Sequence, residues 1–217
     1  MVNGAHSVDA GVFSTWLESM ESVIKDGRGS NVPCGDCTAC CTSSQFIHIQ
    51  PDEAETLDHV PKALLFPAPK MPIGHVLMGY DERGHCPMLI DNECSIYDYR
   101  PRTCRSYDCR VFAASGHNLN SPDHALIADR VRQWRFQLPT EDDRLDLAAV
   151  RAAARYLDEH ADDCGVTSGP NATTQHSLLA LQLARFFREI PDGSDETVHE
   201  SPTSEAVRVE IRRLRRG

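Results

Sequence analysis

The chain has 217 residues, a formal net charge of -10 and 41% hydrophobic residues. This length allows one domain with a real hydrophobic core, so the chain does not need disulfides as very small secreted modules do. The acidic balance argues against general binding to nucleic acid phosphates or anionic membranes. No stretch approaches the roughly eighteen consecutive apolar residues that a membrane span requires.

The first part of the chain predicts a helix, a cysteine loop and a strand. Apolar residues at spacings of three and four predict an amphipathic helix from about Asp9 to Lys25. After a break rich in glycine, the first cysteine cluster spans residues 34–41, and residues 45–49 alternate as in a short strand. A short helix is expected between Pro51 and Pro61, and the proline-rich residues 62–79 predict a loop over the cysteine site.

The second part predicts a hairpin and then helices. Two short apolar segments around Asp91-Asn92 predict a hairpin that carries Cys86 and Cys94 on its arms. Helices are expected from Ser121 to about Pro139, over 141–162 and over 176–189. Residues 191–206 have the composition of a flexible linker. For the basic end, residues 207–216, we favour an edge strand or solvated tail over a nucleic-acid arm.

Together these elements predict an α+β fold, in which a loop-rich cysteine-cluster domain with short strands packs against a mainly helical remainder. The expected parts are an N-terminal helix (1–28), a metal-binding domain (29–115), a helical packing region (116–190), and a linker with a basic tail (191–217).

The cysteines are concentrated in one part of the chain. Eight of the nine lie between residues 34 and 109, and the ninth, Cys164, is expected to pack as a small apolar group. The N-terminal residues have no secretory signal pattern, so we expect a cytoplasmic chain whose thiols stay reduced. In that compartment such a pattern favours metal binding or catalysis over a disulfide framework. The candidate metal ligands are Cys34, Cys37, Cys40, Cys41, Cys86, Cys94, Cys104 and Cys109.

The spacing of the first cluster leaves the metal open. Two residues between successive thiols let Cys34, Cys37 and Cys40 face one centre, as in iron–sulfur ferredoxins, whereas structural zinc sites use separate pairs. Cys41 follows Cys40 directly, and adjacent cysteines rarely point at one ion. The eight thiols therefore make two four-ligand sites, or one site with spare thiols.

Other polar residues near the second cluster have two interpretations each. The arginines either offset thiolate charge or pair with Asp91, Asp98 and Asp108. His85 is the best candidate for a nitrogen ligand, while His75 and Met78 either approach a metal or simply pack. The arginines in question are Arg100, Arg102, Arg105 and Arg110.

Three motifs occur in order: Cys-x-x-Cys-x-x-Cys-Cys, Cys-Pro-x-Leu, and Cys-x-Ile-Tyr-x-x-Arg-Pro-x-x-Cys-Arg-x-Tyr-x-Cys. In this combination the chain resembles the CxxCxxCC, or YkgJ-type, cysteine-cluster family over about residues 30–112. The resemblance implies a zinc- or iron-chelating domain, often described as holding an iron–sulfur cluster. Four residues separate Cys104 from Cys109 where three are expected, which leaves the placement of Cys109 open.

Two functions remain at this stage. The first is a metal-binding protein that holds an iron–sulfur cluster or zinc, with metal ions and a protein as partners and no membrane or nucleic acid. The alternative is an enzyme that uses the same centre, either an iron–sulfur oxidoreductase or a protein methyltransferase, since the family resemblance extends to relatives that look like flagellin lysine N-methylases. No glycine-rich nucleotide loop is visible, and the catalytic residues of such an enzyme are unknown from the sequence.

Overall fold

The computed structural model describes residues 7–27, 29–30, 32–119, 122–166, 172–188 and 202–216. It is a mixed α+β protein with helices and short strands, which confirms the predicted fold class. The chain divides into two compact units, which are described separately below. Unit 1 comprises residues 1–21, 110–119 and 133–217, and unit 2 comprises residues 22–109 and 120–132. Most of the predicted linker, residues 191–201, lies outside the described residues.

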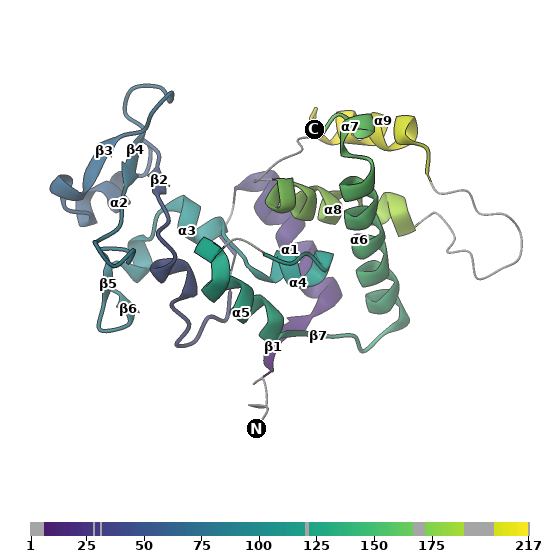
Figure 1. Ribbon diagram of the computed structural model, residues 1–217, viewed down its shortest axis with the longest axis horizontal. Coiled ribbons are helices and arrows are strands. Elements are labelled where there is room, and N and C mark those ends of the chain that lie inside the picture. Colours follow the sequence, from purple (N-terminus) through teal and green to yellow (C-terminus); the bar gives the residue numbers. More distant parts are fainter. Residues whose placement is uncertain are drawn as a thin grey trace, which may run out of the picture. The chain divides into compact units, whose positions relative to one another are not determined.

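Unit 1 is built mainly from helices. The long helices α6 (Glu141–Glu159) and α8 (Ala172–Arg188) lie side by side, and α4 (Arg110–Ser115) packs against both (Figure 1). Their facing sides are apolar and fully buried, as at Leu157 and Leu181. The short helix α7 (Ala161–Cys164) ends at buried Cys164. These helices confirm the two predicted over 141–162 and 176–189.

Two strands of unit 1 correct the prediction. Strand β1 (Val8–Val12) pairs in parallel with β7 (Trp134–Gln137), although both segments were expected to be helical. Helix α1 (Phe13–Asp26) therefore begins later than predicted, and α5 (Ala125–Gln133) ends earlier. Valine and aromatic residues have high strand propensity, and pairing between distant segments outweighs the local helical spacing.

The basic C-terminal segment is also a helix, which corrects the expected strand or tail. Helix α9 (Ser204–Leu214) begins at Thr203, whose side chain accepts a hydrogen bond from the Ala206 N–H at 3.3 Å. Val207 and Ile211 are buried four positions apart, whereas Val209 is exposed. Val207, Val209 and Ile211 alternate with charged residues, as in a strand that has one buried face. In the helix, residues 207 and 211 share a face and residue 209 points elsewhere.

Unit 2 contains small sheets around a small core. Strands β2 (Ile47–Ile49), β3 (Leu65–Pro67) and β4 (Val76–Met78) form an antiparallel sheet with β4 in the middle. Strands β5 (Leu89–Ile90) and β6 (Glu93–Cys94) form a hairpin. Its helices include α2 (Ala54–His59), α3 (Arg102–Ser106) and nearly all of α5. The buried core is Ile49, Val60, Met78, Met88 and Ile96.

Part of the prediction for unit 2 is confirmed and part is wrong. The strand near residues 45–49, the short helix before Pro61 and the hairpin around Asp91-Asn92 are all present. Residues 62–79 are not a single loop, since they contain β3 and β4. The prolines at 67, 69 and 72 lie at the end of β3 and in the connection between the strands, where they do not interrupt the pairing. No helix among the described residues is long and apolar enough to cross a membrane.

Asp143 is a buried carboxylate that joins two segments of unit 1. It accepts hydrogen bonds from the N–H groups of Thr140 and Ser14, both at 3.0 Å, and with Thr140 it forms a capping box at the start of α6. These bonds, above all the one from the Thr140 side chain, hold the pKa of Asp143 well below its usual range. The ionised form is therefore stabilised by folding, and that stabilisation is lost as the pH falls below about 4.

We expect Asp143→Ala to lower the melting temperature by about 5 °C at pH 7, because the cap and the link to Ser14 are both lost. The difference from the unchanged chain should narrow as the pH falls below 4, because Asp143 then becomes protonated in the unfolded chain while it is still ionised in the folded chain. Thermal unfolding followed by circular dichroism measures both effects. The control is Glu141→Ala, which removes an exposed carboxylate from the same helical turn. Equal melting temperatures for Asp143→Ala and the control would contradict the role of the cap.

Candidate metal centre

The segment before the first cysteine lies against the segment that carries Cys104 and Cys109. The Ser30 N–H donates to the Arg105 carbonyl at 2.6 Å, and the Ser30 hydroxyl donates to the Asp108 carboxylate at 2.7 Å. Gly29 makes this approach possible, since a Cβ there would lie 3.2 Å from the Cβ of Arg105. The start of the first cluster and the end of the second are therefore close neighbours.

The first cluster contains a tight turn and a short 3₁₀ helix. The Cys37 N–H donates to the Cys34 carbonyl at 3.0 Å, which brings these two cysteines to the ends of one turn. Cys40 and Cys41 lie in the 3₁₀ helix Ala39–Thr42, and the Cys41 N–H donates to the Thr38 carbonyl at 2.9 Å. Successive side chains of a 3₁₀ helix point about 120° apart. The thiols of Cys40 and Cys41 therefore diverge.

Cys41 lies beside Cys86. The Cys86 N–H donates to the Cys41 carbonyl at 2.7 Å, and the Ser44 N–H donates to the Gly84 carbonyl at 2.9 Å. Gly84 has a positive φ of 80°, and a Cβ there would lie 2.2 Å from the Ser44 hydroxyl, so this contact requires glycine. These bonds hold Cys41 against the segment that leads into the hairpin.

The hairpin places Cys86 and Cys94 together on a packed surface. Asp91 and Asn92 both have positive φ, as a two-residue hairpin turn requires. Cys94 pairs with Leu89, whose N–H donates to the Cys86 carbonyl at 2.9 Å. Both cysteines are partly buried against the core of unit 2.

Helix α3, which carries Cys104, is held by a buried carboxylate. Glu53 accepts hydrogen bonds from the N–H groups of Gln50 at 2.8 Å and of Arg102 at 2.5 Å. The guanidinium of Arg105 lies 3.7 Å from the same carboxylate, and the Thr103 hydroxyl donates to the His48 carbonyl at 2.7 Å. Cys104 is therefore fixed relative to the sheet.

Among the other thiols, those nearest to a cysteine affect its pKa most. Burial raises the pKa of Cys40, and Cys109 has the largest influence of any other thiol on it. Burial raises the pKa of Cys41 to about 11, and there the thiols of Cys86 and then Cys94 contribute most. For Cys104, burial with Cys86, Cys41 and Cys94 raises the pKa to about 12. Cys109, whose placement the sequence left open, thus lies with Cys40.

Among the thiols, Cys40 is influenced most by Cys109 and then by Cys41, Cys34 and Cys37, whereas Cys41 and Cys104 are influenced most by Cys86. We call Cys34, Cys37, Cys40 and Cys109 the first thiol group, and Cys41, Cys86, Cys94 and Cys104 the second thiol group. Among the described residues, however, no group of three or more His, Cys, Asp or Glu side chains is already arranged to hold a metal ion. The grouping therefore rests on neighbourhood and backbone contacts. Four thiolates are a donor set that suits zinc or an iron–sulfur cluster.

The partners of these arginines differ from the predicted ones. Arg102 and Arg105 pair with Asp52 and Glu53 rather than with the expected aspartates, while Arg110 in unit 1 donates to the Ala10 carbonyl at 3.1 Å. Arg100 lies over the ring of Tyr97, and its charge acts on Cys34 and Cys104.

A further cation was missed by the sequence analysis. Arg130 of α5 donates to the Cys34 carbonyl at 2.9 Å, and its charge opposes the rise in the pKa of Cys34 that burial causes. Nothing in the sequence links it to a loop 96 positions earlier.

The other metal-ligand candidates have mixed outcomes. Met78 is buried in the core of unit 2, so it packs rather than approaching a metal. His75 is stacked on His48, with 2.9 Å between their ring nitrogens. The His85 N–H donates to Asp81 at 2.8 Å, and its side chain as a metal ligand stays a prediction.

Unit 1 contains a serine–histidine–aspartate contact that the sequence analysis also missed. His117 lies 2.6 Å from the Ser177 hydroxyl and 2.9 Å from Asp158, which also contacts His176 at 2.7 Å. Ser177 is fully buried inside α8, and its hydroxyl donates to the Thr173 carbonyl at 2.7 Å. The contact therefore ties α8 to α6 and does not present a nucleophile to solvent.

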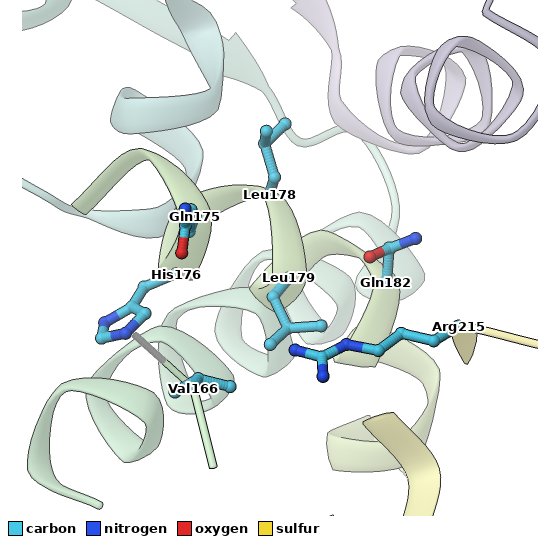
Figure 2. Close-up of a pocket in the computed structure, with 7 residues that line it drawn as sticks. All are labelled: Val166, Gln175, His176, Leu178, Leu179, Gln182 and Arg215. Atoms are coloured by element: carbon cyan, nitrogen blue, oxygen red, sulfur yellow. The ribbon is translucent and has the colours of Figure 1, made fainter. Parts of the chain in front are cut away.

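A pocket of about 450 Å³ lies along α8 in unit 1. Figure 2 shows that α8 supplies most of its wall and that Arg215 extends toward Leu179. The lining contains no cysteine and consists of Val166, Gln175, His176, Leu178, Leu179, Gln182 and Arg215. The pocket therefore shares no lining residue with either thiol group.

These features define a cysteine-rich domain, in which loops and short elements carry eight thiols. Residues 33–129 match the CxxCxxCC family model, described as a putative zinc- or iron-chelating domain. The match confirms the resemblance seen in the sequence, and it ends one residue before Arg130. No curated protein and no solved structure matches the chain.

We expect Glu53→Ala to destabilise the fold by about 2 kcal/mol, since two buried N–H groups lose their acceptor. Urea unfolding of the metal-free chain measures this change. Asp52→Ala is the matched control, because it removes a neighbouring but exposed partner of Arg102. A similar, small effect of both substitutions would show that Glu53 does not hold α3.

The raised pKa values of Cys41 and Cys104 predict that metal uptake releases protons. At pH 7 these thiols are protonated in the metal-free chain, whereas a metal ligand must be a thiolate. Full loading with zinc should release roughly eight protons, one for each ligand, and the affinity should fall as the pH is lowered from 8 to 6. An indicator dye in weak buffer and competition with a chelator measure these quantities. Release of only one or two protons would contradict the prediction that the thiols are protonated in the metal-free chain.

Proposed function

We propose that this chain is a cytoplasmic metal-binding protein whose eight clustered cysteines form two four-thiolate centres. The observation that carries the proposal is the 3₁₀ helix Ala39–Thr42, in which the side chains of Cys40 and Cys41 leave the axis in different directions. The thiol with the largest influence on Cys40 is Cys109, and the one with the largest influence on Cys41 is Cys86. The first and second thiol groups are then the two ligand sets. Each offers four sulfurs, the number that tetrahedral zinc or an iron–sulfur cluster takes from cysteine.

The arrangement of the first thiol group favours iron–sulfur over zinc. In two-cluster ferredoxins, three thiols at C-x-x-C-x-x-C spacing serve one cluster, and the next cysteine of the run ligates the other cluster. Here Cys34, Cys37 and Cys40 have the same spacing, Cys109 is the distant fourth ligand, and Cys41 turns to the second group. When bound, iron–sulfur clusters would supply electron transfer, and zinc would supply structural cross-links.

The chain's own residues position and shield these ligands. The bonds of Glu53, the hairpin turn and the docking of Ser30 bring the segments together before any metal adds its own energy. The alternative, an enzyme using the same centre, needs a substrate site beside the thiols. The pocket of Figure 2 does not supply one, because its lining contains none of the eight cysteines.

The first test is to identify the bound metal by elemental analysis of protein purified without oxygen. Iron with acid-labile sulfide and a brown colour would support iron–sulfur clusters. Stoichiometric zinc in a colourless protein would support two zinc centres and exclude the redox role. Absence of both metals from a folded, reduced protein would refute the proposal.

The test of the two centres compares substitutions within and between the thiol groups. We expect Cys109→Ser to lose about half of the bound metal, because it removes one ligand of the first group only. Adding Cys37→Ser should cause no further loss, whereas adding Cys94→Ser should remove the remainder. Elemental analysis of each variant measures the metal content.

Cys164→Ser is the control for these substitutions, since Cys164 lies in unit 1 and is expected to keep the full metal content. Complete loss of metal from Cys109→Ser, with circular dichroism still native, would instead indicate one shared centre.

A further inference from the structure

The two thiol groups differ in how firmly the protein holds them. In the second group, Cys86 and Cys94 pack against the core, and Cys41 is bonded through its backbone to Cys86. Cys104 belongs to a helix whose first turn is held by buried Glu53. Each ligand of this group is therefore attached to an element that cannot move without disturbing the core of unit 2.

The first group has one weakly held ligand. Cys34 is exposed as a residue, although partial burial of its thiol raises the pKa, and it lies in a segment without helix or strand. Its N–H donates to the Val32 carbonyl at 2.8 Å and its carbonyl accepts from Cys37, so these bonds hold the loop only to itself. Gly35 follows in a left-handed conformation with a φ of 57°, as befits a tight turn.

Arg130 is the contact that ties Cys34 to a helix. Its Nη2 atom donates to the Cys34 carbonyl at 2.9 Å and lies 3.5 Å from the Pro33 carbonyl. The same hydrogen bond places the positive charge of the guanidinium at the backbone of Cys34. Four thiolates around a divalent ion leave a net charge of about −2, so a fixed cation at this ligand stabilises the loaded state.

From this difference we infer that the first thiol group is the exchangeable centre of the protein, and that Arg130 is the positioning residue that keeps it closed. The inference rests on the proposed function, since it assumes two loaded centres. Cys34 is the ligand that dissociates first, because it is exposed. The hydrogen bond from Arg130 to its carbonyl opposes this dissociation, and the second group retains its metal. The protein thus combines one permanent centre with one that passes metal to or accepts it from a competing ligand.

The experiment follows metal release from the loaded chain in excess chelator without oxygen. The probe is 4-(2-pyridylazo)resorcinol for zinc or bathophenanthroline for ferrous iron. We expect two phases of equal amplitude, and the fast phase should disappear in Cys109→Ser. Arg130→Gln should accelerate the fast phase about tenfold, as loss of one charge-assisted hydrogen bond predicts, and leave the slow phase unchanged.

The matched control is Arg132→Gln, which removes the same charge from the same helix at a residue that pairs with Asp129. Arg130→Lys, which keeps the charge but loses the planar fork, should fall between the two. Urea unfolding of the metal-free chains measures how far each substitution destabilises the fold, because Arg130 bonds to the Cys34 carbonyl without metal as well.

The outcomes separate this inference from the proposed function. A chain that purifies without metal, and takes up none, refutes the proposed function itself. Full metal content with a single release phase, or equal acceleration of both phases by Arg130→Gln, leaves the metal-binding function standing and refutes the exchangeable centre. Acceleration of the fast phase by Arg132→Gln to the same extent would show a general charge effect and also overturn the role of Arg130.

Discussion

The peptide bond between Cys40 and Cys41 is the constraint on which the organisation of the cysteines depends. Consecutive Cα atoms are about 3.8 Å apart, and in a 3₁₀ helix their side chains leave the axis in different directions. The thiol with the largest influence on the pKa of Cys40 is accordingly Cys109, and the one with the largest influence on that of Cys41 is Cys86. The segments carrying those two cysteines approach this short helix along different routes, which is why unit 2 needs a hairpin, a short helix and two docked loops around it.

The scaffold around the thiols relies on polar contacts because its core is small. Five buried residues form the centre of unit 2, and partly buried side chains, including Cys86 and Cys94, complete it. A core of this size contributes little stability by itself. Glu53 and Gly84 compensate by specific bonding, since the first satisfies two buried N–H groups and the second allows two chain segments to touch. Metal binding is then a large part of the folding free energy of such a domain.

Local patterns in the sequence were sufficient to predict the elements whose residues interact with near neighbours. The hairpin at Asp91-Asn92 follows from turn chemistry, and the long helices of unit 1 follow from the spacing of their apolar residues. The pairing of Val8–Val12 with Trp134–Gln137 could not be predicted, because parallel strands depend on partners far away in the chain. The tail was misread because Val209, an exposed valine, completed an apparent alternation.

For the site, cysteine spacing predicted eight candidate ligands, which stay a prediction, but it did not predict how they group or what surrounds them. The role of Arg130 was invisible, since a lone arginine in a helix carries no pattern that points to Cys34.

The distance in sequence between Cys40 and Cys109 has a consequence for how the protein is made. About 70 residues separate the two, so the first three ligands of their group leave the ribosome well before the fourth. At typical rates of synthesis this interval lasts roughly 4 to 14 s. During that time the nascent chain presents a C-x-x-C-x-x-C run of reduced, unshielded thiols. Oxidation or capture of a wrong ion at this stage competes with correct assembly, so a cell that makes this protein benefits from a reducing environment and from metal delivered at the moment of translation.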